Sequence, residues 1–276
     1  MNSEKVRSGK SQEIPDSRQL KESQIGYVVP TLGNNLEWLA HSLESLRLSS
    51  KDCKIVIISK SQTEPLTRLA EKYSTVLVQE ETRGVYPALN QGVALLESLG
   101  VDYFAFLGDD DVLIPGSTSN LLKEFQDPTV AVAYGRIWYV DKKLITKMSN
   151  SGYPILKILL NWIPNIIPNP GTLIRISHFN KIGKYDPALK WAGDLDLWLR
   201  IRKIGKIRFV DTPVALFRWH DESLTAGQRR ESLKEASLVR SRNSKKILKP
   251  FHMIWEPFIT LIGEILRKMK WQNKEC

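Results

Sequence analysis

The stretch that most constrains this chain is an apolar run that leads into three consecutive aspartates. Residues 103–107 are Tyr-Phe-Ala-Phe-Leu, which predicts a buried strand, and Asp109, Asp110 and Asp111 follow after one glycine. In an open α/β sheet, ligands bind in the crevice outside the carboxyl ends of the strands. Three carboxylates there are unfavourable without a positive partner, and hard oxygen ligands suit Mg²⁺ or Mn²⁺. The alternative is a solvated acidic turn that caps the next helix.

Strand and helix patterns alternate along the chain, which predicts a doubly wound, mostly parallel α/β sheet flanked by helices. The run Ile-Val-Ile-Ile at residues 55–58 is continuous rather than alternating, as is typical of a parallel strand covered on both faces. The first predicted strands are residues 25–29, 54–58, 75–78 and 102–107, and the helices between them are residues 36–48, 65–73 and 86–99. Later strands are predicted at residues 130–140, 173–176, 206–210 and 214–219, with a hairpin turn at 141–143.

Length and composition predict one core domain with an appended tail. A chain of 276 residues can bury a full α/β core. Residues 1–23 are polar and lack the apolar segment of a signal peptide, so we predict a disordered segment. We place the core domain at residues 24–226 and a basic, helical C-terminal extension at residues 227–276.

The positive charge predicts an anionic partner. The formal net charge is +10, and much of the excess lies in the C-terminal extension. Residues 251–271 place aromatic and aliphatic side chains at helical spacing, with lysines and an arginine near the end. Such a helix can pack on the core or lie in a membrane interface. No segment is long and apolar enough to predict a membrane span, and two distant cysteines favour a reducing compartment.

Two polar side chains outside the triple aspartate could carry chemistry. Asp194 follows Gly193 at a predicted helix start, so it is either a capping residue or a general base for a hydroxyl group. His220 follows a predicted strand, and it is either a hydrogen-bonded loop residue or a nitrogen ligand for a metal near Asp111. The segment from Arg83 to Asn90 opens a helix with a glycine and a positive charge, which suits a phosphate or a nucleotide ring. Phosphate-binding loops of the Gly-x-Gly-x-x-Gly and P-loop types are not present, nor is a zinc-binding spacing.

Five stretches in order resemble the family 2 glycosyltransferases, the inverting nucleotide-sugar enzymes with the GT-A fold. The resemblance covers about residues 25–225. The stretches are Val28-Val29-Pro30-Thr31, the Gly84-Val85-Tyr86-Pro87-Ala88-Leu89-Asn90-Gln91-Gly92 segment, Phe106-Leu107-Gly108-Asp109-Asp110-Asp111, Ile182-Gly183-Lys184-Tyr185-Asp186 with Asp194-Leu195-Asp196-Leu197-Trp198-Leu199-Arg200, and Phe217-Arg218-Trp219-His220.

The resemblance implies a role for each of these sites. Asp109 and Asp111 would hold Mg²⁺ or Mn²⁺ on the donor diphosphate, with Asp110 beside the ribose or the metal. His220 would complete the metal site, and Asp194 would deprotonate the acceptor hydroxyl. The residues implied in donor binding are Pro30, Thr31, Ser59, Arg83, Asn90, Asp109 and Asp110.

Three positions depart from the family pattern. Ser59-Lys60-Ser61-Gln62 stands where the family has an Asp-Asp-Gly-Ser stretch that reads the nucleobase. Pro87 replaces an acidic residue, and Gly193 replaces the glutamate of a Glu-Asp pair.

The resemblance implies a metal-dependent inverting glycosyltransferase that uses a nucleotide-sugar donor and a hydroxyl of a glycan or lipid-linked acceptor. Surface polysaccharide synthesis is the expected setting, in the cytoplasm or at the inner face of the cell membrane through the C-terminal helix, and no nucleic acid partner is expected. A nucleotidyltransferase is a second enzymatic alternative. A non-catalytic nucleotide- or glycan-binding relative, or a peripheral membrane protein, is the other alternative, which the altered Ser59-Lys60 stretch favours.

Overall fold

The structure is a computed structural model. It describes residues 20–21, 24–151, 160–162, 165–220, 229–244, 255, 257, 258 and 261. The predicted N-terminal segment falls almost wholly outside the described residues, and so does most of the helix predicted at residues 251–271. None of the helices in the described part of the chain is long and apolar enough to cross a membrane.

The described residues form one nine-stranded sheet in the order β3-β2-β1-β4-β8-β6-β9-β5, with β7 paired to β6. The strands are β1 (Ile25–Thr31), β2 (Lys54–Ser59), β3 (Val76–Gln79), β4 (Tyr103–Phe106), β5 (Val112–Leu113), β6 (Val130–Val140), β7 (Thr146–Ser151), β8 (Leu173–Arg175) and β9 (Lys206–Arg218). The first four strands are parallel, as the continuous apolar runs predicted. Beyond them the sheet is mixed, because β8 runs antiparallel to both β4 and β6 while β9 is parallel to β6.

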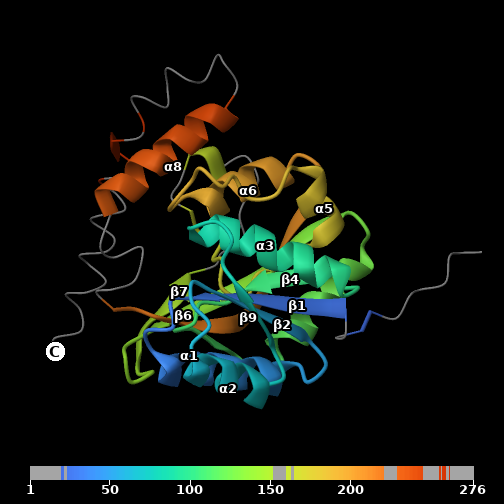
Figure 1. The fold of residues 1–276 in the computed structure, drawn as a ribbon. Coiled ribbons are helices and arrows are strands. Elements are labelled where there is room, and N and C mark those ends of the chain that lie inside the picture. The colour runs from blue at the N-terminus through green and yellow to red at the C-terminus, as the bar shows by residue number, and fades with distance from the viewer. Residues whose placement is uncertain are drawn as a thin grey trace, which may run out of the picture.

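Helices cover both faces of this sheet, which confirms the predicted α/β architecture (Figure 1). The helices are α1 (Leu36–Ser49), α2 (Glu64–Lys72), α3 (Val85–Ser98), α4 (Ser117–Leu122), the 3₁₀ helix η2 (Lys123–Gln126), α5 (Ile176–Lys181), α6 (Gly193–Ile201) and α8 (Arg229–Asn243). Figure 1 shows α1 and α2 on one face and α3, α5 and α6 on the other, with α8 on the outer side of α6. Two separate hydrophobic clusters fill the space on the two sides of the sheet.

Two glycines let α3 lie unusually close to β1. A Cβ atom added at Gly26 in β1 would lie 2.5 Å from the Leu96 side chain, and one added at Gly92 in α3 would lie 2.4 Å from the Val28 side chain. Both contacts are shorter than packed carbon atoms tolerate, so a side chain at either glycine would push the helix off the sheet. This close packing fixes the position of α3 on β1.

One prediction about the second half of the sheet was wrong. Residues 206–210 and 214–219 were expected as two strands, but Lys206–Arg218 is a single strand, β9. Its pairing with β6 shifts register near Gly135 and Arg136, opposite Pro213. This irregularity lets one strand continue past a proline, which removes a ladder hydrogen bond. The predicted hairpin at residues 141–143 is confirmed, because β6 and β7 pair antiparallel across it.

Candidate active site

The three aspartates after β4 point to three different partners. The chain turns there, with the Asp111 N–H donating to the Gly108 carbonyl at 3.2 Å. The Thr31 hydroxyl donates to Asp109 Oδ2 at 2.5 Å, from the end of β1. The Asp111 carboxylate instead accepts the backbone N–H of Arg218 at 3.1 Å. The three carboxylates therefore have different hydrogen-bond partners, although Asp110 and Asp111 each place an oxygen beside Gly108.

The partner of Asp110 is His220. Its Nε2 lies 2.8 Å from Asp110 Oδ2. Strand β9 ends next to the acidic turn because Val112 and Leu113 of β5 pair with it. The sequence predicted that His220 would meet the turn at Asp109 and Asp111, and the structure brings it to Asp110.

Asp111 has the environment of a structural residue. It is buried, and burial followed by the charge of Asp110 raises the pKa of Asp111 well above its usual range. The Ser42 hydroxyl donates to the Asp111 carbonyl, so the backbone is fixed as well. Asp110 is thus the carboxylate paired with His220, while one oxygen of Asp111, which was expected to hold the metal with Asp109 and His220, accepts the Arg218 N–H.

The Asp110–His220 pair combines two kinds of side chain that can bind a divalent metal. The Asp110 side chain is 23% exposed and the His220 side chain 8%, so the pair opens to solvent on one side. A carboxylate oxygen and an imidazole nitrogen both suit Mn²⁺, and Mg²⁺ accepts the carboxylate. No group of three His, Cys, Asp or Glu side chains arranged to hold a metal occurs among the described residues. A Mg²⁺ ion that also binds substrate phosphates usually takes only one or two protein carboxylates.

Asp194 lies in the first turn of α6, but it is not the residue that caps the helix. Ala192 occupies the capping position and makes no side-chain hydrogen bond there. The Asp194 carboxylate accepts the Leu195 N–H at 2.7 Å through Oδ1 and the Asn165 side-chain amide at 2.8 Å through Oδ2. Burial, with a smaller contribution from the charge of Glu235, raises the pKa of Asp194 to about 6. A carboxylate of that pKa is ionised at neutral pH and is more basic than an exposed one.

The segment 165–171 connects Asp194 to the end of β4. Asn165 holds the Asp194 carboxylate at one end of this segment. At the other end Pro170 forms a bridge with Phe106, and the Gly171 N–H donates to the Phe106 carbonyl at 2.8 Å. The segment 165–171 therefore contacts both Asp194 and the last residue of β4, which the acidic turn follows.

The Tyr86 ring leaves no room for a side chain at position 193, which explains the glycine there. A Cβ atom added at Gly193 would lie 2.5 Å from the ring of Tyr86 in α3. Tyr86 stacks on Tyr185 with ring centroids 5.3 Å apart, and the Tyr185 hydroxyl donates to Asn169 at 3.3 Å. Burial, then the nearby charge of Asp194, raises the pKa of Tyr86 well above its usual range. The two stacked rings lie beside Asp194, which is half-buried.

The residues predicted to bind the donor fall into two groups. Pro30 and Thr31 end β1, and Thr31 contacts the acidic turn through Asp109. Asn90 uses its side-chain amide on the backbone of Tyr185, donating at 2.9 Å and accepting at 3.1 Å. Ser59 is buried and donates to the Ser61 carbonyl at 3.0 Å, and Arg83 is exposed in the loop before α3. Thr31 is thus brought to the site, whereas Ser59 and Asn90 have structural partners.

Comparison with known proteins identifies the family. Residues 27–183 match Glycosyl transferase family 2. The chain belongs to this family. Among its curated relatives are an uncharacterized glycosyltransferase of Rickettsia felis, 24% identical over 212 residues, and RT0329 of Rickettsia typhi, 23% identical over 219 residues. The matches cover 72% and 73% of this chain, but only 34% and 65% of the two relatives.

Solved structures confirm the GT-A fold. One is S. aureus TarS 1-349 in complex with UDP-GlcNAc, with a TM-score of 0.61, 14% identity, and coverage of 83% of this chain and 69% of TarS. Another is the mannosyltransferase PcManGT from Pyrobaculum calidifontis in complex with GDP-Man and Mn²⁺. Its TM-score is 0.60 at 16% identity, with coverage of 88% of this chain and 71% of PcManGT. At these identities the likeness concerns the fold.

Three residues at this candidate site were missed from the sequence. Asn165 and Glu235 act on α6 from distant parts of the chain, and no periodic pattern marks them. Trp38 in α1 places its ring 5.0 Å from the His220 ring and 4.7 Å from the Arg218 guanidinium. A signal for Trp38 does exist, because an aromatic residue in the first turn after the β1 loop lies next to the strand ends.

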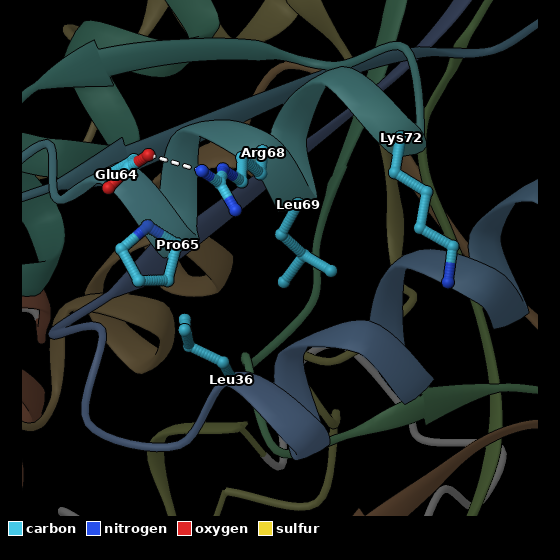
Figure 2. A pocket seen from close by; sticks show the side chains of 6 residues that line it. All are labelled: Leu36, Glu64, Pro65, Arg68, Leu69 and Lys72. Carbon is cyan, nitrogen blue, oxygen red and sulfur yellow. Dashed lines mark hydrogen bonds and ion pairs between the residues drawn. The ribbon is translucent and has the colours of Figure 1, made fainter.

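A pocket of about 360 Å³ lies between α1 and α2, away from the predicted residues (Figure 2). It is lined by Leu36, Glu64, Pro65, Arg68, Leu69 and Lys72. Figure 2 shows the Arg68 guanidinium paired with Glu64 on α2, at 2.5 Å. This ion pair is exposed and contributes little to stability. None of the residues proposed for chemistry lines this pocket, so we place the candidate active site at the strand ends.

Proposed function

We propose that this chain is an inverting glycosyltransferase that depends on a divalent metal and moves a sugar from a nucleotide-diphosphate donor to a hydroxyl group. The observation that carries the proposal is the position of Asp194. Its carboxylate has a pKa raised to about 6, and the segment 165–171 ties it to the strand end that carries the acidic turn. Such a transfer needs a general base for the acceptor and, near it, side chains that can hold a metal on the donor phosphates.

Asp194 would accept the proton of the acceptor hydroxyl. The Asn165 amide and the Leu195 N–H hold its two oxygens, so the carboxylate is oriented before the acceptor arrives. Attack on the anomeric carbon from the face opposite the leaving group inverts the configuration and passes through an oxocarbenium-like state. The Tyr86 and Tyr185 rings beside Asp194 would shield this step from water.

Asp110 and His220 would hold Mg²⁺ or Mn²⁺, with Asp109 beside them. A bound cation of this kind supplies a Lewis acid that stabilises the charge on the departing diphosphate. Thr31 orients Asp109, while Asp111 and Arg218 fix the backbone of the turn. The Mn²⁺ in the PcManGT complex supports a divalent metal as the cofactor.

The donor class rests on the related structures, since TarS binds UDP-GlcNAc and PcManGT binds GDP-Man. The acceptor is proposed to be a glycan or a lipid-linked saccharide in surface polysaccharide synthesis. We also propose that residues 24–226 are the catalytic domain and that the basic extension at residues 227–276 brings it to the inner face of the membrane. The relatives supply no acceptor that could narrow this choice.

Nucleotide-dependent thermal stability tests the proposal. The full chain would be heated with UDP, GDP, dTDP or CMP, with and without Mn²⁺, beside Asp110→Asn and the exposed-site control Asp52→Asn. A ligand that binds only the folded state raises the melting temperature. We expect one nucleotide to stabilise only with Mn²⁺, in the parent chain and in Asp52→Asn but not in Asp110→Asn. An equal rise in melting temperature with and without Mn²⁺, or no rise with any nucleotide, would instead support the non-catalytic alternative.

A further inference from the structure

A glutamate on α8 binds the backbone immediately before the helix that carries Asp194. Glu235 Oε2 accepts the N–H groups of Trp191 at 2.6 Å and Ala192 at 2.7 Å, and Oε1 accepts that of Lys190 at 2.9 Å. Three consecutive backbone N–H groups therefore converge on one carboxylate. The last of them, Ala192, is the capping residue of α6 and has no side-chain cap of its own.

The same face of α8 holds α6 at a second place. Arg242 donates to Asp186 at 2.8 Å and to Asp196 at 2.7 Å, and Asp196 is fully buried inside α6. Val239 lies between these two contacts and is buried in the hydrophobic cluster that includes α6. Positions 235, 239 and 242 recur at the spacing of one helix face, so α8 is docked in a single orientation. That orientation places the Glu235 carboxylate at the N–H groups of residues 190–192.

We propose that Glu235 is a positioning residue for the transfer reaction: by binding the amides of residues 190–192, it fixes the start of α6 and so aims Asp194 at the acceptor hydroxyl. This inference rests on the proposed function, in which Asp194 is the base. Asp194 is two residues beyond Ala192, and a loop free to move would shift its carboxylate relative to Asn165 and the acidic turn. Small displacements of a reacting group reduce the rate strongly without changing how substrates bind elsewhere.

Glu235 also acts on Asp194 through its charge. The titratable groups that interact electrostatically with Asp194 include Glu235 from α8, Tyr86 from α3 and Tyr185 from the loop before α6. Of these, Glu235 adds to the effect of burial in raising the pKa of Asp194. Removing that charge while retaining an oxygen acceptor separates the electrostatic effect from the positioning effect.

Three variants of the full chain make the test: Glu235→Ala, Glu235→Gln and, as a control on the same helix, Glu231→Ala, whose parent side chain is exposed. In Glu235→Ala we expect kcat to fall by about tenfold or more while KM for the donor stays within about twofold. Glu235→Gln keeps one oxygen for Trp191 and Ala192, so it should restore most of kcat. Its acid limb of kcat should move to lower pH, because the charge that raised the pKa of Asp194 is gone.

Hydrogen exchange supplies a readout that needs no activity. The amides of residues 190–192 should lose protection in Glu235→Ala, keep much of it in Glu235→Gln, and be unchanged in Glu231→Ala. Asp194→Asn is measured in parallel. If Asp194→Asn removes turnover while Glu235→Ala keeps kcat and amide protection at the parent level, the positioning role is overturned and the proposed function stands. If Asp194→Asn turns over like the parent chain, both the base and the role given to Glu235 fail.

Discussion

Asp111 and Arg218 lock the acidic turn onto the end of β9 from both sides. The Asp111 carboxylate accepts the Arg218 backbone N–H at 3.1 Å, and Arg218 Nε donates to the Asp110 carbonyl at 2.8 Å. Arg218 also donates to the Lys142 carbonyl at 2.6 Å and lies over the Trp38 ring. Because both side chains are buried, this pairing holds Asp110 and His220 within contact of each other.

Arg218→Ala should therefore lower the free energy of unfolding by about 3 kcal/mol or more, because the Asp110 and Lys142 carbonyls lose their donor and the positive charge beside the buried Asp111 is removed. Arg218→Lys should recover less than half of this loss, since one ammonium cannot replace a guanidinium fork. Urea unfolding of both variants is the measurement. Arg68→Ala, which breaks an exposed ion pair, is the control and should change stability by less than about 1 kcal/mol. Equal losses in Arg218→Ala and Arg68→Ala would show that the turn is not locked.

Gly193→Ala should destabilise the chain by about 1–3 kcal/mol, because the added methyl group meets the Tyr86 ring. The double-mutant cycle with Tyr86→Leu tests this reason directly. In the Tyr86→Leu background the ring is gone, so Gly193→Ala should cost clearly less. Strict additivity of the two changes in urea unfolding would mean that the ring does not exclude the side chain.

The raised pKa of Asp194 predicts the acid side of the pH profile. A general base acts in its ionised form, so kcat/KM should fall roughly tenfold for each pH unit below about 6. Steady-state transfer rates between about pH 5 and pH 8 would show this limb. A rate that stays constant down to pH 5 would contradict the assignment of Asp194 as base.

The raised pKa of Asp194 should make the folded state less stable as pH rises, whereas activity should increase over the same range. The folded value of about 6 lies above the ordinary value of 3.8, so between these values the folded state holds a proton that the unfolded state has lost. Stability from this group is therefore full below about pH 4 and falls as pH rises to about 6. Asp194→Asn cannot titrate, so its stability relative to the parent chain should rise through this window, by at most about 3 kcal/mol. Unfolding free energies at both ends of the window measure it, and a difference independent of pH would refute the shift.

The sequence was sufficient for the first half of the sheet. Continuous apolar runs such as Val56-Ile57-Ile58 have few alternatives to a buried parallel strand, and the structure pairs them as predicted. The edge that carries the site follows from the same argument, because Asp109 comes directly after β4. A continuous apolar run indicates a strand that is buried on both faces. Such a strand is typical of a parallel sheet with helices on both sides.

The roles of adjacent side chains could not be predicted in the same way. Asp110 and Asp111 have the same chemistry, and only the turn between Gly108 and Asp111 decides that one meets His220 and the other Arg218. The contact of the Asn90 amide with the Tyr185 backbone, 95 residues away, was not predicted either. Contacts of this kind join residues far apart in the chain, and neither spacing nor composition marks them. The contact of Glu235 with the start of α6 belongs to the same class.

Turnover of nucleotide sugars tests the central claim most directly. The full chain would be incubated with a panel of nucleotide-diphosphate sugars and Mn²⁺, and both nucleoside diphosphate and pyrophosphate would be measured. Asp110→Asn and Asp194→Asn would be assayed beside the exposed-site control Asp52→Asn. We predict release of nucleoside diphosphate from one donor, at equal rates in the parent chain and Asp52→Asn, and its loss in Asp110→Asn and Asp194→Asn. Pyrophosphate release, or no turnover of any donor together with no metal-dependent nucleotide binding, would contradict the account.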